Sequence, residues 1–478
     1  VVACHSRNGL DENETWRDVG LLVGGTQDAP VLQHVTTACH HCVDPGCLAG
    51  CPVNAYEKDA VTGIVKHLDD QCFGCRYCTL ACPYDVPQYH ADKGIVRKCD
   101  MCSSRLAADE APACVQACPH EAIRIQLVDV NKVVEDAEAN SFLPAAPDPQ
   151  LTLPTTTYRT RRAFPRNALP ADYFAVNPQH PHWPLVVMLV LTQLSVGAFV
   201  VGLALQNAPS VRPSDAWSNW HAPFALVLGL IALAASTLHL GRPHLAYRAV
   251  LGIRHSWLSR EIVAFGVFAG LACALCAAGT AEAAWLRPIR MLLAWSVAGV
   301  GIAAVFCSAM VYVATQRDCW SFSRVAIRFG LSTMLLGAAA SCCTLLIVAR
   351  SSEAEAARRF ALDAAPRVLQ FVIAVSAAKL LFESASFSHL ASRRMTAEKR
   401  SALLMTRQLS RFTLARFALG LLGGLGALLL LRRVTGDGTV EEAVMLTMML
   451  AGCLLGELLE RYLFFAAAAN PRMPGTIR

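Results

Sequence analysis

Twelve of the 20 cysteines form three blocks before residue 120, and each block ends in Cys-Pro. The blocks are Cys39, Cys42, Cys47 and Cys51; Cys72, Cys75, Cys78 and Cys82; and Cys99, Cys102, Cys114 and Cys118. Three closely spaced thiolates can bind three corners of a [4Fe–4S] cluster, while the fourth cysteine binds the other cluster of a pair. Structural zinc is the alternative, because paired C-x2-C elements often bind it. Zinc explains neither the third cysteine of each block nor the recurring C-x3-C-P, so we predict iron–sulfur clusters.

Exchange of fourth ligands between blocks predicts how the cysteines are shared. The predicted sets are Cys39, Cys42 and Cys47 with Cys82; Cys72, Cys75 and Cys78 with Cys51; and Cys99, Cys102 and Cys114 with the lone Cys4. Cys118 is left as a ligand of a fourth cluster. The sequence begins with Val rather than Met shortly before Cys4, so we expect an N-terminal cysteine block that lies outside it. Such a domain would carry electrons one at a time between distant partners.

The second half of the chain is apolar enough to cross a membrane repeatedly. Hydrophobic residues make up 54% of the sequence and charged residues 16%, against roughly 25% charged in soluble globular proteins. This composition excludes a wholly soluble enzyme and a disordered chain. We expect eight transmembrane helices near 184–206, 220–240, 261–280, 291–314, 325–349, 366–387, 411–431 and 443–467. A large buried helical core is the alternative, but these runs lack polar faces.

The expected architecture therefore has three parts. Residues 1–125 form an α+β, ferredoxin-like polyferredoxin domain, in which stretches such as GIVKHL and EAIRIQL make small hairpin strands. Residues 126–183 form an extended, proline-rich connector that is ordered only against a partner surface. Residues 184–478 form an all-α bundle of eight transmembrane helices.

The distribution of basic residues predicts the orientation in the membrane. Eight spans place both ends of the bundle on one side. The loops on that side, with the C-terminal tail, carry 14 Lys and Arg residues, whereas the opposite loops carry eight. The positive-inside rule then places the cysteine-rich domain in the cytoplasm, at the inner membrane. The net charge of +6 is modest, and the arginines are spread between the apolar runs rather than gathered in one patch. Nucleic acid is therefore not expected as a partner.

Ionisable residues within the spans lie in the half that faces the cysteine-rich domain. They are His239, Glu261, Arg328, Lys379, Glu383, Arg416, Glu457, Glu460 and Arg461. Such residues usually line a cavity or pair with one another. Lys379 and Glu383 are one turn apart and can neutralise each other, while Arg416, Glu460 and Arg461 are interpreted as snorkelling or docking groups.

This one-sided distribution predicts a quinone pocket and no proton path across the bilayer. Haem is not expected, because it needs histidines on facing helices and His239 is the one histidine well placed within a span. An imidazole can hydrogen-bond a quinone oxygen and exchange a proton near neutral pH, although a helix-end histidine can also simply bond a backbone carbonyl. The candidate quinone-binding residues are His239, Arg242, Glu261 and Glu457.

Several stretches resemble two subunits of the dimethyl-sulfoxide-reductase family of molybdenum oxidoreductases. CHHCVDPGCLAGCP, CFGCRYCTLACPYDVPQY, KCDMC and PACVQACP resemble its four-cluster electron-transfer subunit. HLGRPHLAYRA, SWLSRE and GELLERYLFF resemble its eight-helix membrane anchor. The chain looks like a natural fusion of the two, but it lacks the family's first cysteine block.

The resemblance implies a separate catalytic subunit with a molybdopterin site, so this chain would be the non-catalytic, quinone-reactive subunit of an oxidoreductase complex. It also implies an order of the clusters: the incomplete cluster of Cys118 faces that subunit, and the cluster of Cys51, Cys72, Cys75 and Cys78 lies nearest the membrane. In the anchor, it implies that His239 belongs to the quinol site and that haem is absent. SWLSRE and GELLERYLFF look closer to the anchors of sulfite dehydrogenases, which favours sulfite oxidation with electrons passing to quinone. Quinol-dependent reduction of dimethyl sulfoxide or another oxide is the alternative. A structural or ion-translocating anchor is an alternative of another class.

Overall fold

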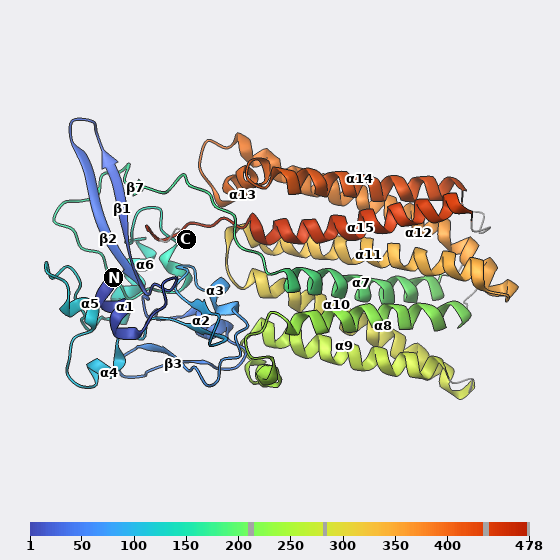
Figure 1. The fold of residues 1–478 in the computed structure, drawn as a ribbon, viewed down its shortest axis with the longest axis horizontal. Coiled ribbons are helices and arrows are strands. Elements are labelled where there is room, and N and C mark those ends of the chain that lie inside the picture. The colour runs from blue at the N-terminus through green and yellow to red at the C-terminus, as the bar shows by residue number, and fades with distance from the viewer. Residues whose placement is uncertain (209–214, 281–283, 434–438, 476–478) are drawn as a thin grey trace.

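The computed structural model describes residues 1–208, 215–280, 284–433 and 439–475. A cysteine-rich part of short strands and helices lies at one end, and a bundle of long helices extends from it (Figure 1). Two of the basic residues used to predict the orientation, Arg212 and Arg478, lie outside the described residues.

The cysteine-rich part contains short elements separated by loops that hold the cysteines. They are α1 (Val2–Asn8), β1 (Arg17–Gly25), β2 (Pro30–Ala38), α2 (Gly46–Gly50), β3 (Tyr56–Lys58), β4 (Val65–His67), α3 (Tyr77–Ala81), β5 (Gln88–His90), β6 (Ile95–Arg97), α4 (Ser103–Leu106) and α5 (Ala113–Gln116). The pairs β3–β4 and β5–β6 are antiparallel hairpins. This arrangement confirms the predicted α+β domain, and β4 falls within the predicted GIVKHL strand.

Two features of this region differ from the prediction. The EAIRIQL stretch at 121–127, all of it described, forms no strand. The longest hairpin is instead β1–β2, which pairs in full register from Arg17 with Ala38 to Gly25 with Pro30 and projects from the body (Figure 1). The sequence reasoning missed this hairpin because VGLLVGG and VLQHVTT lack a strict alternation of buried and exposed residues.

The connector also has more structure than an extended segment would. It contains α6 (Val130–Glu138), the 3₁₀ turn η1 (Pro149–Leu151) and β7 (Leu169–Pro170), which pairs antiparallel with β1. The Asp129 side chain caps α6 by accepting a hydrogen bond from the Asn131 amide. The connector is therefore ordered against this chain's own cysteine-rich part, and needs no partner surface for that.

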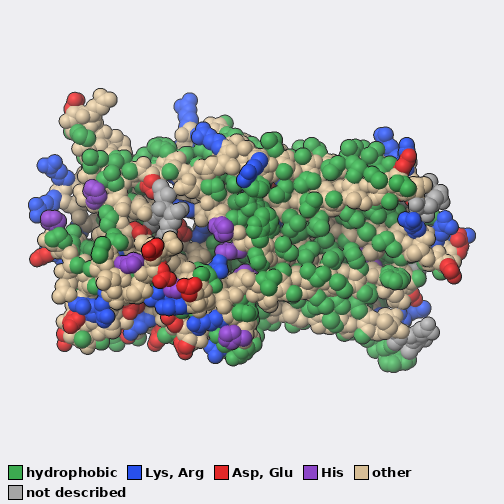
Figure 2. Space-filling model, viewed as in Figure 1, with side chains coloured by type: hydrophobic (Ala, Val, Ile, Leu, Met, Phe, Trp, Pro, Cys, Tyr) green, Lys and Arg blue, Asp and Glu red, His purple; other side chains and the backbone are tan. Residues whose placement is uncertain are grey.

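Within the described ranges, eight helices of the bundle are long and apolar enough to cross a membrane, which confirms the predicted number. They are α7 (Trp183–Gln206), α8 (Asp215–Thr237), α9 (Trp257–Gly279), α10 (Arg287–Val313), α11 (Phe322–Ser351), α12 (Glu355–Ser384), α14 (Ser410–Arg433) and α15 (Val440–Ala466). Shorter elements connect them: η2 (Pro243–Gly252), η3 (Ala284–Leu286), η4 (Asp318–Trp320), η5 (Ala385–Ala391) and α13 (Ala397–Thr406). On the face shown in Figure 2, hydrophobic side chains cover most of the bundle, and charged ones gather at its two ends.

The bundle consists of two groups of four helices. Helices α7–α10 pack around one another, and α11, α12, α14 and α15 form the second group. The groups meet along α7 and α11, where Gly197 and Gly337 bring the two backbones together: a Cβ on Gly337 would meet the backbone of Gly197. Helix α7 is thus the most buried of the eight and carries residues that face both groups.

Candidate metal centres and the domain junction

The fold gathers twelve thiols into three sets of four, drawn from loops far apart in the sequence. The distal set is Cys4, Cys99, Cys102 and Cys114; the middle set is Cys39, Cys42, Cys47 and Cys82; and the anchor-side set is Cys51, Cys72, Cys75 and Cys78. One cavity is lined by all four thiols of the middle set. These are the sets that exchange of fourth ligands predicts.

The thiols of one set lie close enough to raise one another's pKa. Burial raises the pKa of Cys78 well above its ordinary value, and the neighbouring Cys75, Cys51 and Cys72 add to the rise. Burial likewise raises the pKa of Cys4, with further contributions from Cys114 and Cys102. Neutral thiols packed this tightly gain nothing from each other, whereas a bound cation would stabilise their thiolates. The donor chemistry therefore fits a metal centre.

A repeated turn follows the last cysteine of each block. The residue three places after that cysteine has a left-handed backbone: Asn54 at φ 54°, Asp85 at φ 52° and Glu121 at φ 48°. This turn directs the next amide at the sulfur, so that the Ala55 N–H donates to Cys51 Sγ at 3.3 Å and the Ala122 N–H to Cys118 Sγ at 3.2 Å. Amide donors stabilise a thiolate and tune a metal bound to it. A Cys-Pro-x-Asn/Asp pattern could have revealed two of the three turns.

Cys118 has this turn although it belongs to none of the three sets. Hydrogen bonds from the Ala122 and His120 amides lower the pKa of its thiol. The side chain is half-buried. Its local geometry thus matches that of Cys51, which lies in a complete set.

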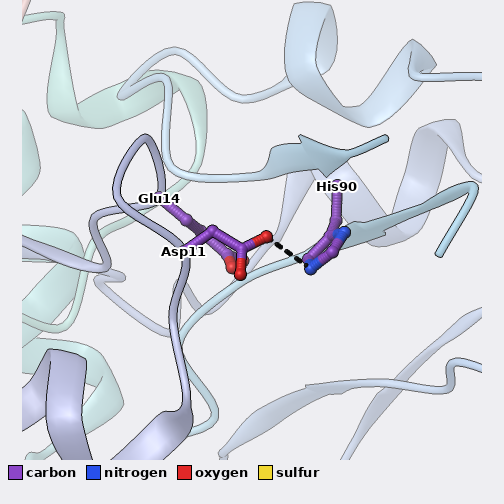
Figure 3. Close-up of side chains that lie close together, drawn as sticks. All are labelled: Asp11, Glu14 and His90. Carbon is purple, nitrogen blue, oxygen red and sulfur yellow. Dashed lines mark ion pairs between the residues drawn. The ribbon is translucent and has the colours of Figure 1, made fainter. Parts of the chain in front are cut away.

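A polar clip holds the segment that carries Cys4. His90 Nε2 pairs with Asp11 Oδ2 at 2.9 Å, and these side chains lie beside Glu14 (Figure 3). Glu14 also pairs with Arg97 at 2.9 Å and accepts a hydrogen bond from Trp16 Nε1 at 3.0 Å. Because Glu14 is already neutralised by Arg97 and both nitrogens of His90 are engaged, we interpret the group as a structural clip between the N-terminal segment and the β5–β6 hairpin.

The three sets follow one another toward the bundle. Lys98 lies between the distal and middle sets. Its Nζ is 3.6 Å from Cys39 Sγ of the middle set, and the next residue in the sequence, Cys99, belongs to the distal set. Tyr56 lies between the middle and anchor-side sets: burial raises its pKa well above the ordinary value, and Cys78, Cys47 and Cys51 add to the shift. Each set therefore adjoins the next.

Loops of the anchor-side set contact the bundle directly. The amide of Arg242 donates to the Phe73 carbonyl at 3.0 Å, and Ser256 Oγ donates to the Gly50 carbonyl at 2.7 Å. Gly241 packs so closely on Gly94 that an added Cβ would overlap the Gly94 carbonyl. Tyr77 extends further, and its hydroxyl donates to the Val311 carbonyl near the end of α10 at 2.7 Å. Backbone contacts and side-chain hydroxyls together therefore hold this set against the bundle.

His239 lies at this junction, just past the end of α8. Its Nδ1 is buried and has no hydrogen-bond partner among the described residues. Burial lowers the pKa of His239 to about 4, a hydrogen bond at the Ser236 backbone opposes the shift, and Arg76 adds to it. The imidazole is therefore neutral at pH 7 and can both donate and accept.

Two residues beside His239 were not predicted from the sequence. Arg76 directly follows Cys75 of the anchor-side set, and its NH1 lies 3.1 Å from His182 Nδ1. Burial and Arg76 lower the pKa of His182 to about 4, with smaller effects of His180 and His239. The only signal in the sequence was a cation between two ligating cysteines, in CRYC. The structure thus brings Arg76, His182 and His239 together.

Of the other candidate quinone-binding residues, Arg242 lies at the junction, and Glu261 and Glu457 lie in the helices of the bundle. Arg242 holds the junction by donating to the carbonyls of Asp69 at 2.8 Å and Lys93 at 3.2 Å. Glu261 is buried in α9 and accepts a hydrogen bond from Ser308 of α10. Glu457 lies in the second helix group, between Lys379 and Arg416. Each of these three candidates is therefore engaged with other residues of the chain.

The predicted pair of Lys379 with Glu383 is present in the second helix group, but each residue has a closer partner. Lys379 lies 4.0 Å from Glu383 but 2.7 Å from Glu457, and Arg416 makes the bidentate pair with Glu383, at 2.7 and 2.9 Å. Arg416, Glu460 and Arg461 are buried and do not snorkel. The ion pairs form two clusters. Ser332 joins them, because its hydroxyl donates to Glu457 and accepts a hydrogen bond from Arg461 at 3.3 Å. The resulting ion network has seven charged residues: Arg328, Lys379, Glu383, Arg416, Glu457, Glu460 and Arg461.

Comparison with known proteins assigns both parts of the chain. Residues 31–128 match the 4Fe-4S dicluster domain, and residues 176–467 match the DMSO reductase anchor subunit family. The chain is 39% identical over 137 residues to the B subunit of anaerobic dimethyl sulfoxide reductase from Haemophilus influenzae, a match that covers 27% of this chain and 66% of that protein. It is 41% identical over 154 residues to the B subunit of the Escherichia coli K12 enzyme of the same name, covering 30% and 75%. It is also 42% identical over 110 residues to the hydrogenase-2 operon protein HybA of Escherichia coli O157:H7, covering 22% of this chain and 34% of that one.

Proposed function

Because this protein belongs to the family of DMSO reductase anchor subunits and carries an iron–sulfur dicluster domain ahead of its anchor, we propose that it passes electrons between a separate molybdopterin-containing subunit and the membrane quinone pool. The observation that carries this proposal is the row of three four-thiol sets that ends against the bundle at Arg76 and His239. A row of redox centres that stops at a polar junction is suited to exchange electrons with a lipid-soluble carrier.

The distal, middle and anchor-side sets would each hold one [4Fe–4S] cluster, which supplies one-electron redox chemistry when bound. The chain's own contribution is to orient the sulfurs and to tune them. The amide donors at Ala55 and Ala122, and Lys98 beside Cys39, favour the thiolate forms. Cys118 would complete a fourth cluster whose other ligands lie outside these sets, on the face turned toward the catalytic subunit.

The quinone would bind where His239 lies beside Arg76. The free Nδ1 of His239 can hydrogen-bond a quinone oxygen, and the Arg76 guanidinium stabilises negative charge that develops on the ring during reduction. Glu261 remains a candidate for a proton-exchanging group, because it is a buried carboxyl with one hydroxyl partner. We propose a cytoplasmic position for the cysteine-rich domain, supported by the excess of basic residues in the loops on its side.

Two reactions fit a catalytic partner of this kind. We favour oxidation of sulfite to sulfate, because SWLSRE and GELLERYLFF resemble the corresponding anchors and the cytoplasmic domain suits a cytoplasmic substrate. Each sulfite would take up one water and release two protons and two electrons, which reduce quinone to quinol. Reduction of dimethyl sulfoxide by quinol is the second candidate, favoured by the names of the relatives that match the iron–sulfur part.

The test is to purify the complex from membranes and to assay it in both directions. Sulfite-dependent reduction of a short-chain quinone analogue supports the first reaction, and quinol-dependent reduction of dimethyl sulfoxide supports the second. In both cases His239→Arg should abolish turnover with quinone but leave the iron content unchanged. The matched control is His244→Arg, because His244 is an exposed histidine in the same stretch. Full turnover of the His239 variant would favour a purely structural anchor.

A further inference from the structure

Two cavities lie side by side at the end of the second helix group. One, of about 70 Å³, lies among α11, α12, η5, α13 and α15 and is lined by Arg328, Glu398 and Glu460. The other, of about 130 Å³, lies between the connector and the loop before α11. Its charged lining residues are three acidic ones and two arginines: Asp85, Asp148, Asp318, Arg317 and Arg472. Ala468 forms part of the wall of both. Each is far smaller than a typical pocket for an organic ligand, which needs roughly 300 Å³ or more, but has room for several waters.

The inner cavity is lined by a buried carboxylate that lacks hydrogen-bond partners in the part of the chain that the structure describes. Glu460 is 3% exposed, and neither of its oxygens has a hydrogen-bond partner among the described residues. Its nearest cations are Arg461 NH2 at 3.5 Å and Arg328 NH1 at 3.8 Å, which are ion-pair distances but too long for hydrogen bonds. Lys379 and Arg416 face it from α12 and α14. A buried carboxylate keeps two free acceptors at low cost only where water fills the space beside it.

Acidic residues connect this carboxylate to the solvent. Asp148 and Asp318 are exposed at the outer cavity, and Glu398 lines the inner one. Burial raises the pKa of Asp318, and the carboxylates of Glu398 and Asp148 add to the rise. Arg324, which pairs with Glu398 at 3.1 Å, opposes it, so these four groups lie close to one another. The negative charge of this row of carboxylates stabilises an excess proton in the cavities. Without it, the four cations of the ion network would repel the proton.

We propose that Asp148, Asp318, Glu398 and Glu460 line a hydrated path that carries protons between the aqueous phase at the domain junction and the buried interior of the anchor. The proposal rests on the proposed quinone chemistry. Each quinone that accepts two electrons must also accept two protons, and quinol oxidation returns them by the same path. On the inner side of Glu460, Tyr312 lies within electrostatic range of both Arg461 and Glu261. Glu261 in turn lies within that range of Tyr77, which directly follows Arg76 at the proposed quinone site. The path enters and ends on the side of the cysteine-rich domain and so does not cross the bilayer.

The experiment follows electrons leaving the full-length protein, which needs no knowledge of the partner's substrate. The protein is reduced with dithionite and mixed with a short-chain quinone analogue, and cluster reoxidation is followed by visible absorbance in H₂O and in D₂O. Glu460→Gln should slow reoxidation about tenfold and enlarge the solvent isotope effect, with the iron content and the cluster spectra unchanged. The matched control is Glu355→Gln, because Glu355 is an exposed glutamate paired with Arg359 on α12.

A second variant guards against a failure of Glu460→Gln to assemble. Ala468→Leu adds a larger side chain between the two cavities and so narrows the passage from one to the other, while every carboxylate stays in place. This variant should also slow reoxidation and enlarge the isotope effect. A wild-type rate and isotope effect in either assembled variant overturns the proposal. If wild-type protein is not reoxidised by the quinone at all, the proposed function itself is wrong, and the path falls with it.

Discussion

Glu457 is the centre of the ion network, and its removal should destabilise the anchor more than removal of Lys379. Glu457 lies 2.7 Å from Lys379 and 2.9 Å from Arg416, and it accepts a hydrogen bond from Ser332 at 2.5 Å. Lys379 has one ion pair of this quality, because Glu383 is 4.0 Å away. With all groups ionised, the network has four cationic and three anionic side chains and a net charge of +1.

The magnitudes follow from these distances. At an effective dielectric constant of about 20, each close contact of Glu457 contributes about 6 kcal/mol of Coulomb attraction before desolvation is counted. Breaking a buried pair from one side costs about 3–5 kcal/mol net. Glu457→Gln breaks two pairs and leaves a net charge of +2, so we expect about 5 kcal/mol. Lys379→Met breaks one pair and leaves a neutral network, so we expect about 3 kcal/mol.

The assay is the thermal unfolding midpoint of the purified protein in detergent, followed by loss of helical circular dichroism. A difference of a few kcal/mol corresponds to a lowering on the order of 10 °C for a domain of this size. The order of the two variants is the sharper result. If Glu457→Gln is no less stable than Lys379→Met, the electrostatic account of the network is wrong. Glu355→Gln, at an exposed pair, should stay within about 0.5 kcal/mol of wild type.

Three further predictions concern the cysteine-rich part. Gly241→Ala should separate the anchor-side loops from the bundle, because the Cβ of the alanine would overlap the Gly94 carbonyl. Limited proteolysis should then cleave the variant near the junction. Protection equal to that of wild type would contradict the close packing. Glu14→Gln should loosen the clip and lower the iron content of the distal set, whereas Glu110→Gln, at a more exposed pair, should not. Cys118→Ser should leave the iron content of this chain's three sets unchanged, as measured by iron analysis, but should weaken electron exchange with the catalytic partner.

The parts of the site predicted from sequence are those fixed by local spacing. The C-x2-C-x2-C-x3-C pattern places three thiols on one loop, and the chain can return the fourth cysteine only to a neighbouring loop, so the sets followed from the sequence. The eight spans were predictable for the same reason, since each is a continuous apolar run. The αL turns after the Cys-Pro pairs were missed, although Asn54 and Asp85 are residues that favour such turns.

The polar contacts of the anchor could not be predicted in this way. The spacing of Lys379 and Glu383 on one helix predicts a pair, but helices α14 and α15 supply stronger partners in Arg416 and Glu457. Those contacts depend on how four helices are rotated against one another, and small residues such as Gly420 and Gly456, beside Arg416, set that rotation. The spacing of residues in the sequence predicts contacts within one helix but not contacts between helices. For the same reason Arg76 and His182, which come from two different parts of the chain, were not predicted to meet.

The fusion of the two parts in one chain has a physical consequence for electron transfer. The connector pairs with β1 through β7 and then returns to the bundle, where the Gln179 amide donates to the Ala466 carbonyl at 3.0 Å. A separate iron–sulfur subunit would have to bind the anchor from solution, whereas a tethered one rebinds at a high effective concentration. Close packing at Gly241 and the hydrogen bonds of Arg242 then fix the register of the docked parts. The anchor-side thiols therefore keep one position relative to His239 whenever the chain is folded, and a weak junction suffices to hold it.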